Sequence, residues 1–195
     1  MPNLPDEAAS PAQRQVGKSA PPGYGALWCR ILLPEATQGA ELKKIYTLGY
    51  EGASVPDFIG TLQSVGVSLL LDVRELPQSR RPGFSKRVLS EALEEAGITY
   101  RHMKQLGDPK PGREAARRGD MDSFRAIFGA HIDTEASRTA IGEAAGEVRN
   151  GTVALMCFER APKDCHRSIV ADRIRELVSA DIVHLGVQPG ARTGE

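Results

Sequence analysis

The chain has 195 residues and a mass of 21.0 kDa, with 41% hydrophobic residues. This length suits a single domain with its own core, and the composition excludes collagen-like, coiled-coil and wholly disordered classes. Twenty-five Lys and Arg balance 25 Asp and Glu, so no overall charge excess indicates a nucleic-acid or membrane partner. Three cysteines are too few for a disulfide framework. We therefore expect a cytoplasmic protein that has no membrane partner.

The first 43 residues differ in composition from the rest of the chain. Six of the 13 prolines lie between Pro2 and Pro34, and no apolar periodicity accompanies them. Such a segment buries too little apolar surface to offset the entropy lost on ordering, so we predict that residues 1–43 are a disordered extension. The apolar run Trp28–Leu33 fits either docking on the domain or an incidental position.

Strands and helices alternate in the regular part of the chain. The first predicted strand, residues 45–48, is followed by a helix with Ser54 as its N-cap and Pro56 in its first turn. Apolar residues then recur at helical spacing as far as Gly66. The nearly continuous apolar run of residues 67–73 predicts a strand that is buried on both faces.

The same alternation continues in the second half of the chain. A second helix is predicted from Ser85 to Gly97, and the strand after it covers residues 98–103. The remaining predicted elements are, in order, a helix around residues 121–128, a helix around residues 140–148, a strand over residues 152–158, a helix capped by Asp164 and a strand over residues 181–185.

Apolar strands that alternate with helices are typical of parallel strands joined by helical crossovers. We therefore predict an α/β fold, specifically a three-layer α/β/α arrangement with a mostly parallel central sheet of about five strands. A single α/β domain is expected over residues 44–187, followed by a flexible tail over residues 188–195. The sequence leaves the order of the strands open.

Polar side chains follow three of the predicted strands. The loops that carry them are residues 48–52, 72–81 and 157–167. Because the carboxyl ends of parallel strands meet at one edge of a sheet, we expect these loops to converge where α/β proteins bind ligands. The candidate ligand-binding residues in them are Tyr50, Glu51, Asp72, Arg74, Ser79, Arg80, Arg160 and Arg167.

Positive charge is concentrated in two segments. Residues 72–87 carry a net charge of +3 and residues 101–118 a net charge of +4, while the balancing acidic residues are spread over helices. The planar fork of arginine suits phosphate and carboxylate, so several arginines favour a multiply charged anion. Two simpler interpretations stay open: Asp72 forms a structural ion pair with Arg74 or Arg80, and the basic loops are ordinary solvated charge.

A glutamate, two cysteines and a histidine lie in and around the last of these loops. Cys165 and His166 open a predicted helix, where a thiolate has a lowered pKa and can act as a nucleophile. Glu159 and His166 are suited to proton transfer. The candidate catalytic residues are therefore Glu159, Cys165 and His166. In the alternative interpretation, Cys165 faces the core and His166 bonds a neighbouring carbonyl group, and Cys157 is interpreted as a small core residue.

Metal and cofactor binding have little support in the sequence. The residues with suitable chemistry for zinc are Cys157, Glu159, Cys165 and His166. Their spacing matches no compact zinc signature, and there is no second Cys pair. Neither a Walker loop nor a GxGxxG motif is present. We therefore predict no metal ion and no cofactor.

Several short motifs occur in a characteristic order between about residues 44 and 179. They are Tyr46-Thr47-Leu48-Gly49-Tyr50-Glu51-Gly52, Asp72-Val73-Arg74, Ser79-Arg80, Phe84-Ser85-Lys86, Leu106-Gly107, Cys157-Phe158-Glu159-Arg160 and Cys165-His166-Arg167. This order resembles the family catalogued as domain of unknown function 488. The resemblance implies a compact α/β fold in a prokaryotic-type intracellular protein, and it implies no established reaction. The signature positions that it marks are Asp72, Arg74, Ser79, Arg80, Cys165, His166 and Arg167.

Three functions are compatible with these residues. The first is an enzyme or sensor that acts on a phosphorylated or other anionic ligand, with nucleic acid or a nucleotide as the expected class. The second is a non-catalytic module that binds the nucleic-acid backbone through its basic loops. The third is a thiol-based redox or sulfur-handling protein that uses Cys165. We rank them in this order, and the sequence leaves the oligomeric state open.

Overall fold

The computed structural model describes residues 42–190. Most of the predicted extension over residues 1–43, including the run Trp28–Leu33, and residues 191–195 of the predicted tail lie outside the described residues. The first strand begins at Lys43, one residue before the predicted start of the domain.

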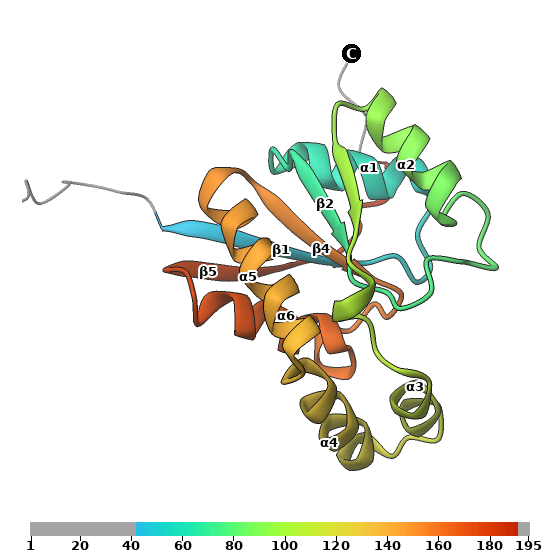
Figure 1. Ribbon diagram of the computed structural model, residues 1–195. Helices are drawn as coiled ribbons and strands as arrows, with labels where there is room; N and C mark the ends of the chain where they lie inside the picture. Colours follow the sequence, from blue (N-terminus) through green and yellow to red (C-terminus); the bar gives the residue numbers. More distant parts are fainter. Residues whose placement is uncertain (1–41, 191–195) are drawn as a thin grey trace, which may run out of the picture. The chain divides into compact units, whose positions relative to one another are not determined.

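A five-stranded sheet forms the middle layer of this part of the chain (Figure 1). Its strands are β1 (Lys43–Gly49), β2 (Leu69–Asp72), β3 (Thr99–His102), β4 (Val153–Cys157) and β5 (Ala180–Leu185). They lie side by side in the order β3-β2-β4-β1-β5, and every neighbouring pair is parallel. The prediction of a mostly parallel sheet of about five strands is confirmed.

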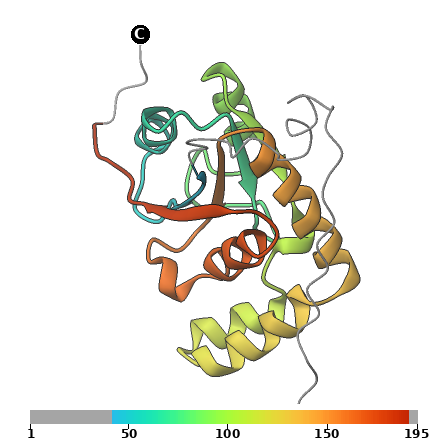
Figure 2. The ribbon, with the colours of Figure 1, turned by 90° about the vertical axis from the view of Figure 1, so that its left-hand side faces the viewer.

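Helices cover both faces of the sheet (Figures 1 and 2). Those on one face are α1 (Val55–Ser64) and α2 (Lys86–Glu95), and those on the other are α5 (Glu135–Asn150) and α6 (His166–Arg175). Two further helices, α3 (Lys110–Arg117) and α4 (Met121–Ile132), pack against each other beside the second face. The three-layer α/β/α fold is therefore confirmed. No helix of the described residues is long and apolar enough to cross a membrane.

The alternation of strand side chains between the two faces explains why the strands are apolar throughout. In β2, Leu69 and Leu71 belong to the core beneath α4, α5 and α6, whereas Leu70 belongs to the core beneath α1 and α2. All three leucines are buried, because each face of the central strands is covered by helices. Within residues 42–190, the edge strand β3 has no partner on its outer side, and it is only partly buried.

Local capping signals set the beginnings of the helices. Ser54 caps α1 by accepting a hydrogen bond from the Asp57 backbone N–H, and Ser85 is the N-cap of α2 as predicted. The predicted cap at Asp164 is wrong: α6 begins at His166 and its N-cap is Cys165. Asp164 instead ends a short 3₁₀ helix, η2 (Pro162–Asp164), after which Cys165 adopts an extended conformation.

One helix was not predicted, and three strands are shorter than predicted, including β4, which is one residue shorter at each end. In α3, the buried positions are the small residues Gly112 and Ala115, which leave no strong apolar periodicity to read. The strands predicted over residues 67–73 and 98–103 contain β2 and β3, whose hydrogen-bonded pairing covers only four residues each. Neighbouring apolar residues are buried without being part of the strand, as at Val67 and Val73.

The strand order creates a crevice at the carboxyl edge of the sheet. After β1 and β2 the chain crosses to α1 and α2 on one face, whereas after β4, which lies between them, it crosses to α6 on the other. Loops that diverge in this way leave an opening above the strand ends. The predicted convergence of the three polar loops at one sheet edge is confirmed by the parallel pairing of β1, β2 and β4.

Candidate functional site

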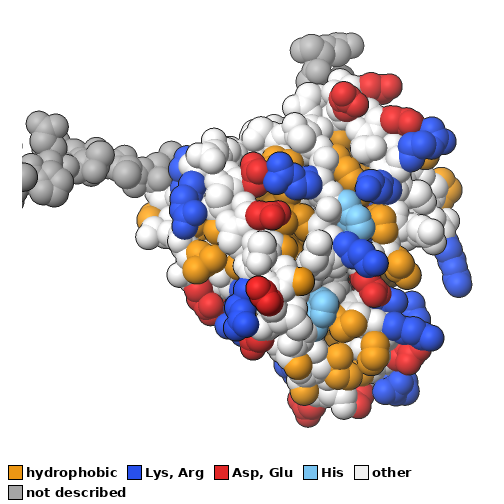
Figure 3. Space-filling model, viewed as in Figure 1, with side chains coloured by type: hydrophobic (Ala, Val, Ile, Leu, Met, Phe, Trp, Pro, Cys, Tyr) orange, Lys and Arg blue, Asp and Glu red, His pale blue; other side chains and the backbone are white. Residues whose placement is uncertain are grey.

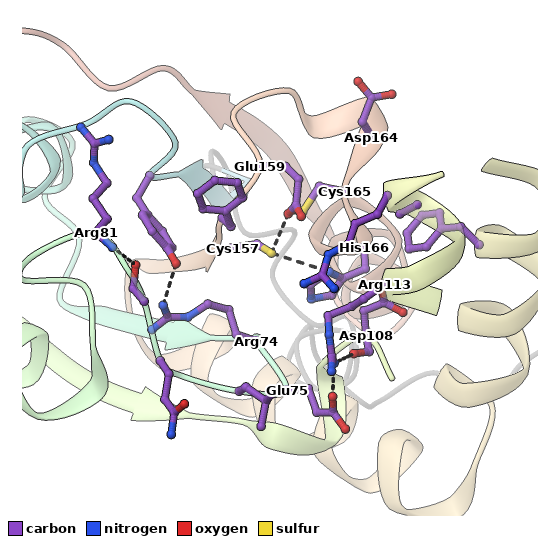
Figure 4. Close-up of a pocket in the computed structure, with 18 of the residues that line it drawn as sticks. Arg74, Glu75, Arg81, Asp108, Arg113, Cys157, Glu159, Asp164, Cys165 and His166 are labelled. Atoms are coloured by element: carbon purple, nitrogen blue, oxygen red, sulfur yellow. Dashed lines mark hydrogen bonds and ion pairs between the residues drawn. The ribbon is translucent and has the colours of Figure 1, made fainter. Parts of the chain in front are cut away.

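A pocket of about 910 Å³ opens at this edge of the sheet (Figure 4). Its walls come from the ends of β1, β2 and β4, from the start of α6 and from α3 and α4. The predicted site residues that line it are Tyr50, Arg74, Ser79, Arg80, Glu159, Cys165 and His166. The structure thus brings together side chains that are more than 100 positions apart in the sequence.

The other four predicted site residues do not line the pocket. Arg167 is fully buried, and its guanidinium group donates hydrogen bonds to the backbone carbonyl oxygens of Glu159 and Arg160. The Glu51 carboxylate accepts a hydrogen bond of 3.1 Å from the Arg160 backbone N–H. Asp72 lies below Arg74, fully buried. Three of these residues, Glu51, Asp72 and Arg167, therefore position loops around the pocket.

Asp72 and Arg74 form a buried, two-pronged ion pair. The Arg74 Nε donates to Asp72 Oδ1 at 2.8 Å, and its Nη2 lies 2.5 Å from Oδ2. The Arg74 Nη1 donates to the Tyr50 hydroxyl at 2.9 Å and to the Phe84 carbonyl oxygen at 3.0 Å. The Tyr100 hydroxyl donates to Asp72 Oδ2 at 2.6 Å. Because at least four of the five guanidinium N–H groups are occupied, Arg74 has little capacity left for a ligand.

This network also determines how its members titrate. Although burial lowers the pKa of Arg74, the hydrogen bond and the negative charge of Asp72 raise it above its ordinary value. Burial, together with the charge of Asp72, raises the pKa of Tyr100. The structural ion pair that the sequence left open is the arrangement found, with Arg74 rather than Arg80 as the partner.

Two cysteines, a glutamate and a histidine form a cluster at the inner end of the pocket (Figure 4). The thiols of Cys157 and Cys165 both donate to Glu159 Oε2, at 2.9 and 3.2 Å. His166 Nδ1 lies 3.7 Å from the Cys157 sulfur, and its Nε2 lies 2.6 Å from the Val73 carbonyl oxygen. A carbonyl oxygen can only accept, so Nε2 carries a proton and Nδ1 faces the cysteines.

The environment of the cluster favours neutral thiols. Burial raises the pKa of Cys157 and raises that of Cys165 well above its ordinary value. The lowered pKa predicted for Cys165 at a helix N-terminus is therefore wrong, because the loss of hydration outweighs the helix. Burial opposes the charge on Glu159, but the thiol hydrogen bonds from Cys157 and Cys165 lower its pKa. Burial likewise lowers the pKa of His166, but its interaction with Cys165 raises that pKa to about 9.

The segment around α3 supplies pocket residues that were not proposed from the sequence. Arg113 forms an ion pair with Glu75, and Arg117 lies one helical turn further on and lines the same pocket. Asp108 is 5% exposed, and its Oδ1 has no hydrogen-bond partner in the part of the chain that the structure describes. Burial raises the pKa of Asp108 to about 6. The basic excess of residues 101–118 pointed to the arginines, whereas nothing in the sequence singled out Asp108.

Comparison with known protein families shows which family the chain belongs to. The family described as Domain of unknown function DUF488 matches residues 54–174, which is more than half of the chain. The chain belongs to the DUF488 family. Neither the curated proteins nor the solved structures contain a match. The motif at Tyr46–Gly52 lies immediately before the matched residues, and the motifs of the β2, β4 and α6 loops lie within them.

Two glycines among these DUF488 motifs allow the pocket loops to approach closely. Gly49, at the end of β1, lies against the backbone of Glu159, and a Cβ atom there would overlap the Glu159 carbonyl oxygen. Gly107 lies in the same way against the backbone of Glu75, where a Cβ atom would overlap the amide nitrogen. Both contacts are with main-chain atoms, which cannot rotate away as a side chain can. Gly49 therefore allows the Glu159 loop to lie against the end of β1, and Gly107 allows its own segment to lie against Glu75.

The close approach at Gly49 gives a direct test of the site's construction. The Gly49→Ala substitution is expected to lower the free energy of unfolding by about 1–3 kcal/mol, because the added methyl group pushes the Glu159 loop away from β1. Denaturant titration measures this change. Gly142→Ala in α5 is the control, because among the described residues no atom outside the adjoining helix backbone lies within 4 Å of its added Cβ, and alanine favours the helix. Equal effects of the two substitutions would contradict the close packing at Gly49.

Proposed function

We propose that this pocket binds a phosphorylated ligand of the nucleotide class, and that the protein is an enzyme or sensor for that ligand. The observation that carries the proposal is a pair of exposed arginines. Arg80, from the loop after β2, and Arg117, from α3, line the same pocket. Among the described residues neither side chain has a hydrogen bond or an ion pair, so both guanidinium groups are available to an anion.

These two arginines differ from the others in the pocket. Arg74 is held by Asp72, and Arg113 is held by Glu75 and by the Asp108 carbonyl oxygen. Arg81 donates from its Nε to the Ala53 carbonyl oxygen, which leaves its terminal nitrogens for a ligand. Lys and Arg side chains also gather at the surface over α3 and α4, beside apolar groups (Figure 3). The pocket therefore contains several arginines whose guanidinium nitrogens are available, and together they can bind a multiply charged group.

Apolar surface in the same pocket supports a ligand that also carries an aromatic ring. Phe158 is 43% exposed and Leu76 is 55% exposed, and both line the pocket. Phe158 packs edge-on against Tyr50, with their ring centroids 5.4 Å apart, and this contact leaves much of the Phe158 side chain exposed. Nucleobases stack on such rings, and the volume of about 910 Å³ suits a small ligand rather than a duplex. A nucleotide, free or within a single strand, combines both features.

Glu159 is a candidate proton acceptor in this pocket. It lines the pocket, and thiol hydrogen bonds lower its pKa, so it is ionised at neutral pH and can accept a proton. If the protein is an enzyme, Glu159→Gln should abolish turnover while nucleotide binding is retained. If it is a sensor or a binding module, this variant should behave like the wild type in every binding assay.

The proposal is tested by titrating labelled nucleotides and short single- and double-stranded oligonucleotides in fluorescence anisotropy at two salt concentrations. We expect Arg80→Gln/Arg117→Gln to weaken binding by about tenfold for each arginine. The control is Arg87→Gln/Arg125→Gln, which removes the same charge from exposed ion pairs outside the pocket. Equal losses in the two double variants, or no binding of any phosphorylated probe at low salt, would refute the proposal.

A further inference from the structure

We infer that the cluster at the inner end of the pocket is a binding site for a thiophilic divalent metal ion of the zinc class. Its ligands are the sulfur atoms of Cys157 and Cys165, Nδ1 of His166 and a carboxylate oxygen of Glu159. This site goes beyond the proposed nucleotide binding and does not rest on it. The sequence predicted no metal here, because the spacing of these residues matches no compact zinc signature.

The distances within the cluster match a tetrahedral metal site. The four ligand atoms all lie within 4.8 Å of one another. Zinc bond lengths of about 2.0–2.3 Å place tetrahedral ligand atoms about 3.3–3.8 Å apart. Of the separations within the cluster, 3.7 Å lies inside this range, and 2.9 and 3.2 Å lie just below it. Small side-chain movements therefore suffice to make room for an ion.

The orientation of His166 is that of a metal ligand. Its Nε2–H is directed to the Val73 carbonyl oxygen at 2.6 Å, so Nδ1 is turned toward the cysteine sulfurs (Figure 4). Metal-bound histidines characteristically donate their second N–H to a carbonyl or carboxylate oxygen, which fixes the tautomer and the ring. The Phe128 ring packs edge-on against the imidazole, with their centroids 5.2 Å apart, and further restricts its rotation.

The backbone holds the remaining ligands in place without the ion. Cys157 ends the buried strand β4, and Cys165 is the N-cap of α6. The buried Arg167 guanidinium group, from α6, donates to the carbonyl oxygens of Glu159 and Arg160 and so anchors the loop that carries the glutamate. The ligands are therefore supplied by rigid elements, as a preorganised site requires.

The chemistry of the donors decides which ion fits. Two thiols and an imidazole favour zinc or a similar soft ion over magnesium and calcium, which prefer oxygen ligands. Binding would release to solvent the two thiol protons that now point to Glu159 Oε2, together with the Nδ1 proton of the charged form of His166. Glu159 is the most exposed of the four residues. A small molecule bound in the pocket would therefore reach the metal ion from the side of Glu159.

The test uses the full chain with Cys29→Ser, so that Cys157 and Cys165 are its only thiols. The protein is reduced, stripped with a chelator and loaded with zinc or cobalt(II), and the bound metal is measured by elemental analysis. We expect one ion per chain and, with cobalt, a thiolate-to-metal charge-transfer band. Cys157→Ser/Cys165→Ser should abolish the band and weaken zinc binding beyond the roughly 10–100-fold cost of losing a second-shell partner.

The matched control is Asp164→Asn, which removes a carboxylate from the same pocket but outside the cluster. It should keep both the stoichiometry and the charge-transfer band, as long as circular dichroism shows all variants folded. The inference is overturned if the parent chain binds no stoichiometric metal, if the double serine variant keeps the band, or if the two thiols form a disulfide and bind no ion. Nucleotide binding by the stripped protein tests the proposed function separately.

Discussion

Replacement of Arg74 with methionine is expected to lower the free energy of unfolding by about 3–5 kcal/mol, the range for removing one member of a buried ion pair. Methionine keeps the apolar stem of the side chain, but it leaves the Asp72 carboxylate fully buried and opposite no positive charge. The Tyr50 hydroxyl and the Phe84 carbonyl oxygen lose a donor as well. Chemical denaturation of wild type and variant measures the difference.

A second pair of variants keeps this prediction testable if Arg74→Met does not fold. In Asp72→Leu/Arg74→Met both charges are removed, so most of the lost stability should return. The control is Arg87→Met, which breaks the exposed pair with Glu91 in α2 and should cost no more than about 0.5 kcal/mol. If Arg74→Met costs as little as Arg87→Met, the buried pair does not stabilise the fold in the way its geometry indicates.

The stability of the protein is also expected to depend on pH through Asp108. Burial raises the pKa of this carboxyl from 3.8 to about 6 in the folded protein, so the folded state holds the proton more tightly than the unfolded chain does. The stability that Asp108 contributes is therefore complete below about pH 4 and is lost as the pH rises through about 6. A shift of this size corresponds to roughly 3 kcal/mol.

The Asp108→Asn variant cannot ionise at this position, so it should be more stable than the wild type at neutral pH. The difference in unfolding free energy between variant and wild type should grow by about 3 kcal/mol between pH 3 and pH 7. Denaturant titrations across this range, on chelator-treated protein, measure it. A difference that stays constant with pH would show that Asp108 is ionised in the folded state as readily as in the unfolded chain.

Asp120→Asn supplies a control of opposite sign. Asp120 is the N-cap of α4, and the hydrogen bonds from the side chain and backbone of Ser123 lower its pKa. The stability that it contributes is present at neutral pH and is lost as the pH falls through its folded pKa. This variant should therefore lose stability relative to the wild type at neutral pH, and the difference should shrink in acid.

Local sequence signals were sufficient for most of the fold. Ser54 and Ser85 mark helix starts because their extended backbone and short polar side chains suit an N-cap. The apolar runs of β2 and β4 predict buried parallel strands, since helices cover both faces of the sheet. Where such signals were weak the prediction failed. Helix α3 was missed because its buried residues, Gly112 and Ala115, are too small to give an apolar pattern. The N-cap of α6 is Cys165 rather than Asp164, because Asp164 belongs to the 3₁₀ helix η2.

For the candidate site, too, some features could be predicted from local sequence patterns and others could not. The amino-acid pattern was enough to predict which loops meet, because parallel strands place their carboxyl ends at one edge, and it identified Cys165, His166 and Glu159 as candidate catalytic residues. The contacts of each side chain, in contrast, became known only from the packed structure. Burial turned Arg74 and Arg167 into structural groups, raised the pKa of Cys165, and brought Cys157 within reach of His166. Desolvation and distances between remote segments are properties of the packed chain, and no local pattern encodes them.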